Sequence, residues 1–334
     1  MHPQLSPDEI RSFQQERGLN VTGSLDVATE RALEDARWKL GDRSLYLQQS
    51  PMMHGDDVAA LQSRLTEMGF DCGRVDGIYG ERTESAVKEF QKSVGAKVDG
   101  RCGPETIIGL IRLTKIVSGG APSQLRESAA TRTRGPALAN KVIVLDPGNN
   151  GDESEIVYDI AVRIEGRLLA LGASVFLTRG AKNAPSESER IAFTNSNATD
   201  LFISLHADSH SNPSAQGVAT YFYGSDAHGV HSVVGERFAS LVQREISART
   251  HLLNCRTHAK TWDLLRLTKA PSVRVDCGYL TNPQDAKSLA TPEFRDALAE
   301  AFIIAIQRLY LAAEDDAKTG TLRISDLRSA GIRR

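Results

Sequence analysis

The chain has 334 residues, which is enough for two or three domains and a large buried core. Hydrophobic residues make up 40% of it and charged residues 25%, as in ordinary globular proteins. The net charge of -2 argues against nucleic acid and anionic membrane surfaces as partners, and no apolar run is long enough for membrane insertion.

The N-terminal sequence and the cysteines both favour a cytoplasmic protein. Residues 1–9 have neither a cationic start nor an apolar core, so they do not resemble a secretory signal. The four cysteines are scattered and form no Cys-x-x-Cys pair, which favours reduced thiols over disulfides or a thiolate zinc site. They are Cys72, Cys102, Cys255 and Cys277.

An internal repeat fills the first third of the chain. Residues 13–18 read Phe-Gln-Gln-Glu-Arg-Gly and return at 90–95 as Phe-Gln-Lys-Ser-Val-Gly, and the residues that follow correspond without a gap. The second copy has an additional leading part, in which Val58, Leu61 and Leu65 fall on one face of a predicted helix.

Turn and cap residues delimit the helices of this second copy. Gly69 is predicted to end the first helix. Val-Asp-Gly at 75–77 and again at 98–100 predicts two turns. Thr83 and Thr106 precede short apolar stretches, and we expect their hydroxyls to cap the helices that follow.

This pattern resembles the peptidoglycan-binding domain-like modules, which are small three-helix units. The resemblance is good over residues 55–113, but it covers only the second half of a module within residues 6–40. It implies a partial module at 1–47, without its first helix, and a module at 48–115. Either the start codon is misplaced or the half-module packs on the second copy. Whether the modules bind glycan or act as helical spacers stays open.

Two segments lack the apolar content of a packed core. Residues 116–139 are rich in Ser, Gly, Thr, Arg and Pro, which predicts a flexible linker. Residues 313–334 hold acidic residues, then Thr319 and Thr321, then a basic end, which predicts a disordered tail.

Residues 140–312 predict an α/β domain whose sheet is sandwiched by helices. Strand-like stretches are expected at 142–145, 174–177, 201–205, 218–223 and 273–279. Helices are expected at 156–171, 187–197, 230–249 and 292–311. Such alternation is typical of an α/β sandwich around a largely parallel or mixed sheet.

The first of these strands leads to the candidate site. Residues 142–145 read as a buried strand that Pro147 and Gly148 stop, which leaves Asp146 and Asn149 at its C-terminal edge. Open α/β sheets usually place their chemistry at this edge. A strand and turn without function is the alternative.

Residues 141–310 resemble the zinc-dependent N-acetylmuramoyl-L-alanine amidases of the Amidase_3 type. The family's Asp-Pro-Gly-His-Gly-Gly turn corresponds to residues 146–151, and its Ser-hydrophobic-His-Ala stretch corresponds to 204–207, where His206 would be a metal ligand. Its metal-binding glutamate corresponds to Glu153, with Glu155 as the alternative.

Two further motifs extend this resemblance. The family's Thr-Arg and Glu-Arg-x-x-x-x-Asn segments match Thr178-Arg179 and residues 189–195. Its catalytic Glu-x-Gly-Phe stretch corresponds to Asp-Cys-Gly-Tyr at 276–279. The resemblance therefore implies a zinc ion with three protein ligands, which activates a water molecule, and a carboxylate that accepts the proton of this water.

The chain departs from the family pattern at two positions. Asn149 replaces a histidine ligand, and an amide oxygen suits zinc poorly. Asp276 replaces the catalytic glutamate; its carboxylate is set back by about a bond length, and misplacement near 1 Å costs on the order of 100-fold in rate. Zinc is thus possible but doubtful, with Glu153 and His206 as the remaining ligands. Three residues are candidates for the missing ligand: Asp146, His210 and His258. The alternative for each is a position that supports the ligands or lies on the protein surface.

The whole chain also resembles an actinobacterial branch of amidase-like regulators. The shared features are the tandem modules, residues 261–268, the two replacements and a Thr-Gly-Thr tail at 319–321. This resemblance implies a cytosolic phosphoprotein that a Ser/Thr kinase modifies at Thr319 and Thr321. It also implies stimulation of the first enzyme of peptidoglycan precursor synthesis, with peptidoglycan or its precursors as further partners.

Three functions are consistent with these observations. The first is a catalytically impaired amidase-fold regulator of cell-wall precursor synthesis in the cytoplasm. The second is an active zinc-dependent N-acetylmuramoyl-L-alanine amidase that cleaves the muramoyl-peptide amide bond, with Asp276 as general base. The third is a wall-binding protein whose amidase domain grips the stem peptide without cleaving it.

Overall fold

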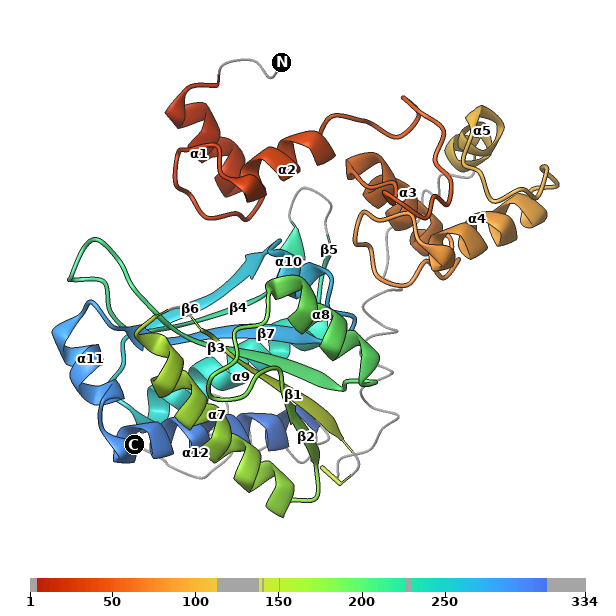
Figure 1. The fold of residues 1–334 in the computed structure, drawn as a ribbon. Coiled ribbons are helices and arrows are strands. Elements are labelled where there is room, and N and C mark those ends of the chain that lie inside the picture. The colour runs from red at the N-terminus through yellow and green to blue at the C-terminus, as the bar shows by residue number, and fades with distance from the viewer. Residues whose placement is uncertain (1–4, 113–137, 140, 150, 226–229, 311–334) are drawn as a thin grey trace, which may run out of the picture.

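The computed structural model describes residues 5–112, 138–139, 141–149, 151–225 and 230–310 (Figure 1). The predicted linker lies outside these residues except at 138–139, and the predicted tail lies outside them entirely. Two parts are apparent in the described residues: a set of N-terminal helices and a larger domain built on a sheet.

Within residues 5–112, five helices form the N-terminal part, and local sequence signals account for their ends. A capping box of Ser6 and Glu9 begins the first helix, and Gly69, with φ of 96°, follows the end of the third as predicted. Val58, Leu61 and Leu65 are fully buried in the core of the second module, as their spacing predicts. The helices are α1 (Pro7–Glu16), α2 (Val27–Asp35), α3 (Asp56–Glu67), α4 (Glu81–Ser93) and α5 (Pro104–Arg112).

The same buried glutamine supports three successive helix–loop–helix units. Gln14, Gln62 and Gln91 lie in α1, α3 and α4, and each Oε1 accepts hydrogen bonds from two consecutive backbone N–H groups of the following loop. Each Nε2 lies within hydrogen-bond distance of a loop carbonyl and of a threonine hydroxyl in the next helix. The unit therefore occurs three times within residues 5–112, although the internal repeat in the sequence indicated two copies.

This glutamine changes the role of the predicted cap residues. Thr83 and Thr106 lie inside α4 and α5 rather than before them, and Gly80 is the N-cap of α4. Their hydroxyls meet the buried amides of Gln62 and Gln91. The capping prediction was wrong because a buried amide that needs partners takes the hydroxyl that a free helix end would otherwise use.

The larger domain is a seven-stranded mixed sheet in the order β2-β1-β3-β7-β4-β5, with β6 also on β4. Strands β1, β2, β3 and β7 are parallel, and β4 is antiparallel to β7. The strands are β1 (Val142–Pro147), β2 (Ser174–Leu177), β3 (Leu201–Asp208), β4 (Val218–Ser225), β5 (Val230–His231), β6 (Asn254–Lys260) and β7 (Ser272–Tyr279). The fold class is as predicted.

The two faces of the sheet are covered differently (Figure 1). Three long helices, α7 (Glu153–Ala170), α9 (Val233–Arg249) and α12 (Pro292–Tyr310), bury the large core on one face. Two shorter ones, α8 (Glu187–Ser196) and α10 (Asp263–Arg266), cover a small apolar cluster on the other. Because side chains alternate along a strand, Asp146 of β1, Ser204 and His206 of β3, and Arg274 and Asp276 of β7 face the side of α8 and α10.

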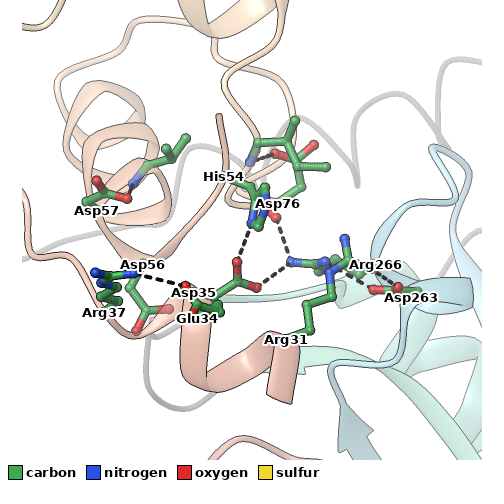
Figure 2. Close-up of polar contacts among 12 residues, drawn as sticks. Arg31, Glu34, Asp35, Arg37, His54, Asp56, Asp57, Asp76, Asp263 and Arg266 are labelled. Carbon is green, nitrogen blue, oxygen red and sulfur yellow. Dashed lines mark hydrogen bonds and ion pairs between the residues drawn. The ribbon is translucent and has the colours of Figure 1, made fainter. Parts of the chain in front are cut away.

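The N-terminal helices dock on the side of α10 (Figure 2). Arg31 of α2 pairs with Asp263, and Arg266 lies 3.7 Å from Asp35. Further contacts join the loops of both modules to this domain: Arg74 to the Thr268 carbonyl at 2.6 Å, Tyr223 to the Val75 carbonyl at 2.9 Å, and Thr261 to the Arg17 carbonyl at 2.6 Å. The half-module also contacts the second copy, through Arg17 and Asp56 at 2.8 Å.

Candidate functional site

The candidate site lies where the parallel strands end, on the sheet face that carries α8. Strand register places Asp146 beside Ser204 and Ser204 beside Arg274. One step further along, His206 lies beside Asp276. All five side chains share one face because each strand contributes alternate residues to it. The sheet therefore brings together two sequence-predicted site residues that are 70 positions apart in the chain.

Glu153 and His206 form the preserved half of the site. Glu153 begins α7, where its Oε2 accepts a hydrogen bond from the Ala207 N–H at 2.8 Å, and its Oε1 lies 3.2 Å from His206 Nδ1. Both side chains are nearly inaccessible. A Cβ atom at Gly148 would lie 2.5 Å from each of these two atoms, so only glycine leaves this space open.

A hydrogen-bond chain fixes the orientation of the His206 ring. The Ser204 hydroxyl donates to Asp146 Oδ2 at 2.7 Å and lies 3.1 Å from His206 Nε2. Because that hydroxyl has a single proton, the network assigns the hydrogen of a neutral ring to Nε2. Nδ1 then directs its lone pair towards Glu153, which is the arrangement that a shared proton or a cation stabilises.

Arginines hold the turn on which this half-site depends. Asp146 is fully buried and accepts hydrogen bonds from Thr178 at 2.6 Å and from Arg190 at 2.6 Å. Arg179 donates to the carbonyls of Pro147 and Gly148 at 2.8 and 2.7 Å. Burial lowers the pKa of Arg179, while the nearby Asp146 opposes this shift. Thr178 and Arg179, the Thr-Arg segment of the sequence, therefore hold the turn at residues 146–148 in place.

Asn149 does not reach the half-site. Its side chain is exposed, and its Oδ1 accepts a hydrogen bond from the Ser154 hydroxyl at 2.8 Å. The substituted position therefore faces the N-terminus of α7 instead of contributing a donor beside Glu153 and His206.

Asp276 is engaged by a second strand residue. The carboxylate is buried, and its Oδ1 accepts a hydrogen bond from Arg274 Nε at 2.8 Å. The Arg274 guanidinium lies 5.1 Å from the centroid of the Trp262 ring, which also packs against Tyr221. Burial lowers the pKa of Arg274, but the charge and hydrogen bond of Asp276, together with the nearby Asp208 and Tyr221, outweigh burial and raise the pKa overall. Burial, and then the charge of Asp276, raises the pKa of the neighbouring Asp208.

The alternative ligands from the sequence lie elsewhere. Glu155 is exposed, and the ring nitrogens of His210 and His258 contact the Asn212 N–H and the Cys255 carbonyl. Asp146 is occupied by Thr178, Arg190 and Ser204.

The described residues meet only part of the requirement for zinc. Two donors on one tetrahedral zinc ion lie about 3.3 Å apart, close to the 3.2 Å between Glu153 and His206. A catalytic zinc takes three protein ligands, however, and no group of three or more carboxylate, imidazole or thiolate side chains converges among the described residues. The residues present therefore do not fit a catalytic zinc centre.

Sequence reasoning missed Arg274 and Ser204 as members of this site. Both stand two residues before a predicted site residue on the same strand, Arg274 before Asp276 and Ser204 before His206. That spacing places the side chains on the same face, so period-two reasoning within the strands was the available signal.

Comparison with known proteins agrees with this fold. The N-acetylmuramoyl-L-alanine amidase family matches residues 143–308, and the putative peptidoglycan binding domain family matches residues 54–108. The N-acetylmuramoyl-L-alanine amidase CwlM of Mycobacterium tuberculosis is 43% identical over 332 residues, which cover 95% of this chain and 82% of that protein.

More distant relatives match a little over half of this chain. The N-acetylmuramoyl-L-alanine amidase AmiC of Neisseria meningitidis is 26% identical over 59% of each chain. The crystal structure of the amidase Ami1 from Mycobacterium smegmatis covers 52% of this chain and 98% of its own, with 24% identity and a TM-score of 0.47. Among the described residues, no helix has the length and apolar character needed to cross a bilayer. The domain architecture and the 43% identity together show that the chain belongs to the N-acetylmuramoyl-L-alanine amidase family.

Proposed function

We propose that this chain is a catalytically impaired amidase-fold protein that regulates cell-wall precursor synthesis from the cytoplasm. The observation that carries the proposal is the division of its site. Glu153 and His206 are positioned as a matched pair, whereas Asn149 faces Ser154 and Asp276 is paired with Arg274. Hydrolysis of an amide needs all of these functions at one point.

The ion pair at Asp276 supports the loss of general-base function. A general base must come within hydrogen-bond reach of the water that it deprotonates. Asp276 is 1% exposed, and Arg274 already neutralises one of its oxygens. A water molecule at this oxygen would have to replace a charge-assisted hydrogen bond from the guanidinium. The shorter side chain adds a geometric loss to this electrostatic one.

The regulatory part of the proposal rests on the resemblance described above. Thr319 and Thr321, the predicted phosphoacceptors, lie outside the described residues. A phosphate adds about two negative charges and three acceptor oxygens, which can create an arginine-binding segment. In this scheme a Ser/Thr kinase modifies the tail, and the modified chain stimulates the first enzyme of peptidoglycan precursor synthesis. The putative peptidoglycan binding domain would supply contact with peptidoglycan or its precursors.

Hydrolysis and regulation can be tested separately. The full chain, dialysed and supplied with zinc, is incubated with muropeptide beside an active family member, and released stem peptide is measured by chromatography. We expect no release from this chain, and turnover comparable to the active enzyme would contradict impaired catalysis. Kinase-treated chain should stimulate the precursor enzyme. The double variant Thr319→Ala/Thr321→Ala should not, and equal stimulation by this variant would contradict the regulatory role.

An active zinc-dependent amidase is the second candidate, favoured by one observation. Glu153 Oε1 and His206 Nδ1 have the separation of two zinc ligands, and Gly148 keeps the space beside them clear. One zinc ion per purified chain, lost in the His206→Ala variant, would support this candidate. Zinc content that His206→Ala leaves unchanged would count against it.

A further inference from the structure

A cavity of about 280 Å³ lies between the end of α1 and strand β6, where the half-module meets the larger domain. The half-module contributes Glu16 and Leu19 to its lining, and β6 contributes His258 and Lys260. The candidate site is separate from this cavity, since none of its residues belongs to the lining.

Lys260 lies in this cavity without a carboxylate partner. Its Nζ donates a hydrogen bond to the Leu19 carbonyl at 3.3 Å and lies 5.7 Å from the centroid of the Trp262 ring. Among the described residues, no carboxylate forms an ion pair with Lys260, whereas Lys88 of α4 pairs with Glu84 at 2.9 Å. Lys260 is partly exposed and lines the cavity, so a small molecule can reach its amine from solvent.

The surroundings of Lys260 favour the neutral amine. Desolvation lowers the pKa of Lys260, because burial disfavours the ammonium form. Glu16 and His258 are the other titratable groups of the cavity, and neither forms a hydrogen bond or an ion pair with Lys260. The neutral amine is the nucleophilic form of lysine, and desolvation is one way in which proteins activate it. Such an amine still donates to the Leu19 carbonyl while its lone pair stays available.

We propose that Lys260 is a site of covalent acylation by small acyl phosphates, and that this modification loosens the docking of the half-module. The amine lone pair attacks the acyl carbon, so that a C–N bond forms and the C–O bond to phosphate breaks. Phosphate leaves with the electron pair of that bond and takes up the proton that the nitrogen loses. The inference does not rest on the proposed function, because it requires neither amide hydrolysis nor phosphorylation of the tail.

The contacts of Lys260 explain why acylation would affect docking. Lys260 and the next residue, Thr261, attach the end of α1 and the loop after it to the larger domain, through the carbonyls of Leu19 and Arg17 at 3.3 and 2.6 Å. Acylation removes the positive charge and with it the cation–π contact to Trp262. It leaves a single amide N–H and places an acyl group in the cavity between α1 and β6. One of the two attachments is therefore weakened.

Acetyl phosphate is the probe for the reaction, and Lys287 is the internal reference because it is exposed and lies in the larger domain. The full chain is treated at neutral pH, and acetylation of each lysine is followed over time by peptide mass spectrometry. We expect Lys260 to react at least about 3-fold faster than Lys287, although it is less accessible. This ratio should fall as pH approaches about 10.4, where exposed lysines also become neutral. A rate at Lys260 equal to or below that at Lys287 overturns the proposal.

Hydrogen exchange on matched variants tests the effect on docking. Lys260→Gln imitates the neutral acylated side chain, whereas Lys260→Arg keeps the charge and removes the reactive amine. We expect faster exchange in α1 of the acetylated chain and of Lys260→Gln, with β1 unchanged. Lys260→Arg treated with acetyl phosphate should keep the α1 exchange of the untreated variant. Unchanged α1 exchange in the acetylated unsubstituted chain overturns the effect on docking. Faster α1 exchange in treated Lys260→Arg also overturns it, because another lysine would then be responsible.

Discussion

The glutamine-supported loops of the modules and the candidate site of the larger domain differ in how completely their hydrogen bonds are formed. In the loops, Gln14, Gln62 and Gln91 make the same set of hydrogen bonds in all three units. In the site, one half of the pattern stays together while the other half is bonded elsewhere. Complete hydrogen-bond sets indicate a structural requirement, whereas a divided set is the arrangement expected if, as proposed above, the chain does not hydrolyse the amide bond.

Breaking the ion pair that holds Asp276 should have the largest effect on stability. Arg274→Met leaves a buried carboxylate without its partner, which we expect to lower the free energy of unfolding by about 3–5 kcal/mol in urea titrations. The double variant Arg274→Met/Asp276→Asn should regain a large part of this loss. Arg82→Met, which removes an exposed partner of Asp71, should cost about 1 kcal/mol or less. Equal effects of Arg274→Met and Arg82→Met would show that Asp276 does not depend on Arg274.

Removing one of the glutamines tests the intact side of the comparison. Gln62→Ala leaves two loop N–H groups and the Thr83 hydroxyl without the amide, so we expect a loss of about 2–4 kcal/mol in the unfolding of the second module. Gln14→Ala should have a comparable effect on the half-module. Hydrogen exchange resolved by segment would measure both. If only one variant loses protection, the structural equivalence of the units is wrong.

The ion pair between Arg31 of α2 and Asp263 of α10 should contribute less to stability than the Asp276–Arg274 pair or the buried glutamines. Asp263→Asn weakens the contact with Arg31, whose side chain is 39% exposed, so we expect about 1 kcal/mol or less. The expected sign is faster hydrogen exchange in α1 and α2, with no change in the site strands. Asp8→Asn is the matched control, because it removes an exposed pair within α1 that does not reach the larger domain. Unchanged exchange in Asp263→Asn would mean that the docking does not depend on this pair.

Two glutamates of α8 should give small pH effects of opposite sign. Desolvation by its surroundings, and then the charge of Asp263, raises the pKa of the exposed Glu187, so the folded chain binds its proton more tightly than the unfolded chain does. Stability from this group is then present below the unfolded pKa and is lost as pH rises through the raised value. Glu187→Gln should remove that loss and stabilise the protein at neutral pH.

Glu189 provides the contrast within the same helix. Hydrogen bonds from Ser186 lower its pKa, so its contribution is present above the unfolded pKa and disappears as pH falls through the lowered value. Glu189→Gln should therefore destabilise the protein at neutral pH. Thermal unfolding between mildly acidic and neutral pH would measure both changes, and shifts of the same sign in the two variants would contradict the assignment.

Much of the fold follows from local patterns in the sequence. Strand stretches at 142–145, 174–177, 201–205, 218–223 and 273–279 and the helices of α7, α8, α9 and α12 are confirmed within a few residues. The strands β5 and β6 and the helices α10 and α11 (Pro283–Leu289) were missed. Strand β6 alternates polar and small residues and gains its place by pairing with β4, so its formation depends on a tertiary partner that no local pattern reveals.

The sequence indicated which residues belong to the candidate site, but not all of the contacts that they make with one another. Motif order identified Glu153 and His206, and the structure places them 3.2 Å apart. The pairing of Asp276 with Arg274 depends on strand register and on the stacking of Arg274 over Trp262. A cavity is lined by Arg17, Asp76 and Trp262, which lie far apart in the chain, so sequence spacing could not predict it.

Zinc content, compared between the unsubstituted chain and Asn149→His, tests the central claim most directly. Each protein is loaded with zinc, dialysed and measured by elemental analysis, with His206→Ala as the baseline. The divided site predicts that the unsubstituted chain stays near that baseline, while an imidazole at 149, if it turns inward, raises retention towards one ion per chain. One tightly held zinc ion in the unsubstituted chain, lost in His206→Ala, would contradict the claim that Glu153 and His206 remain without a third ligand.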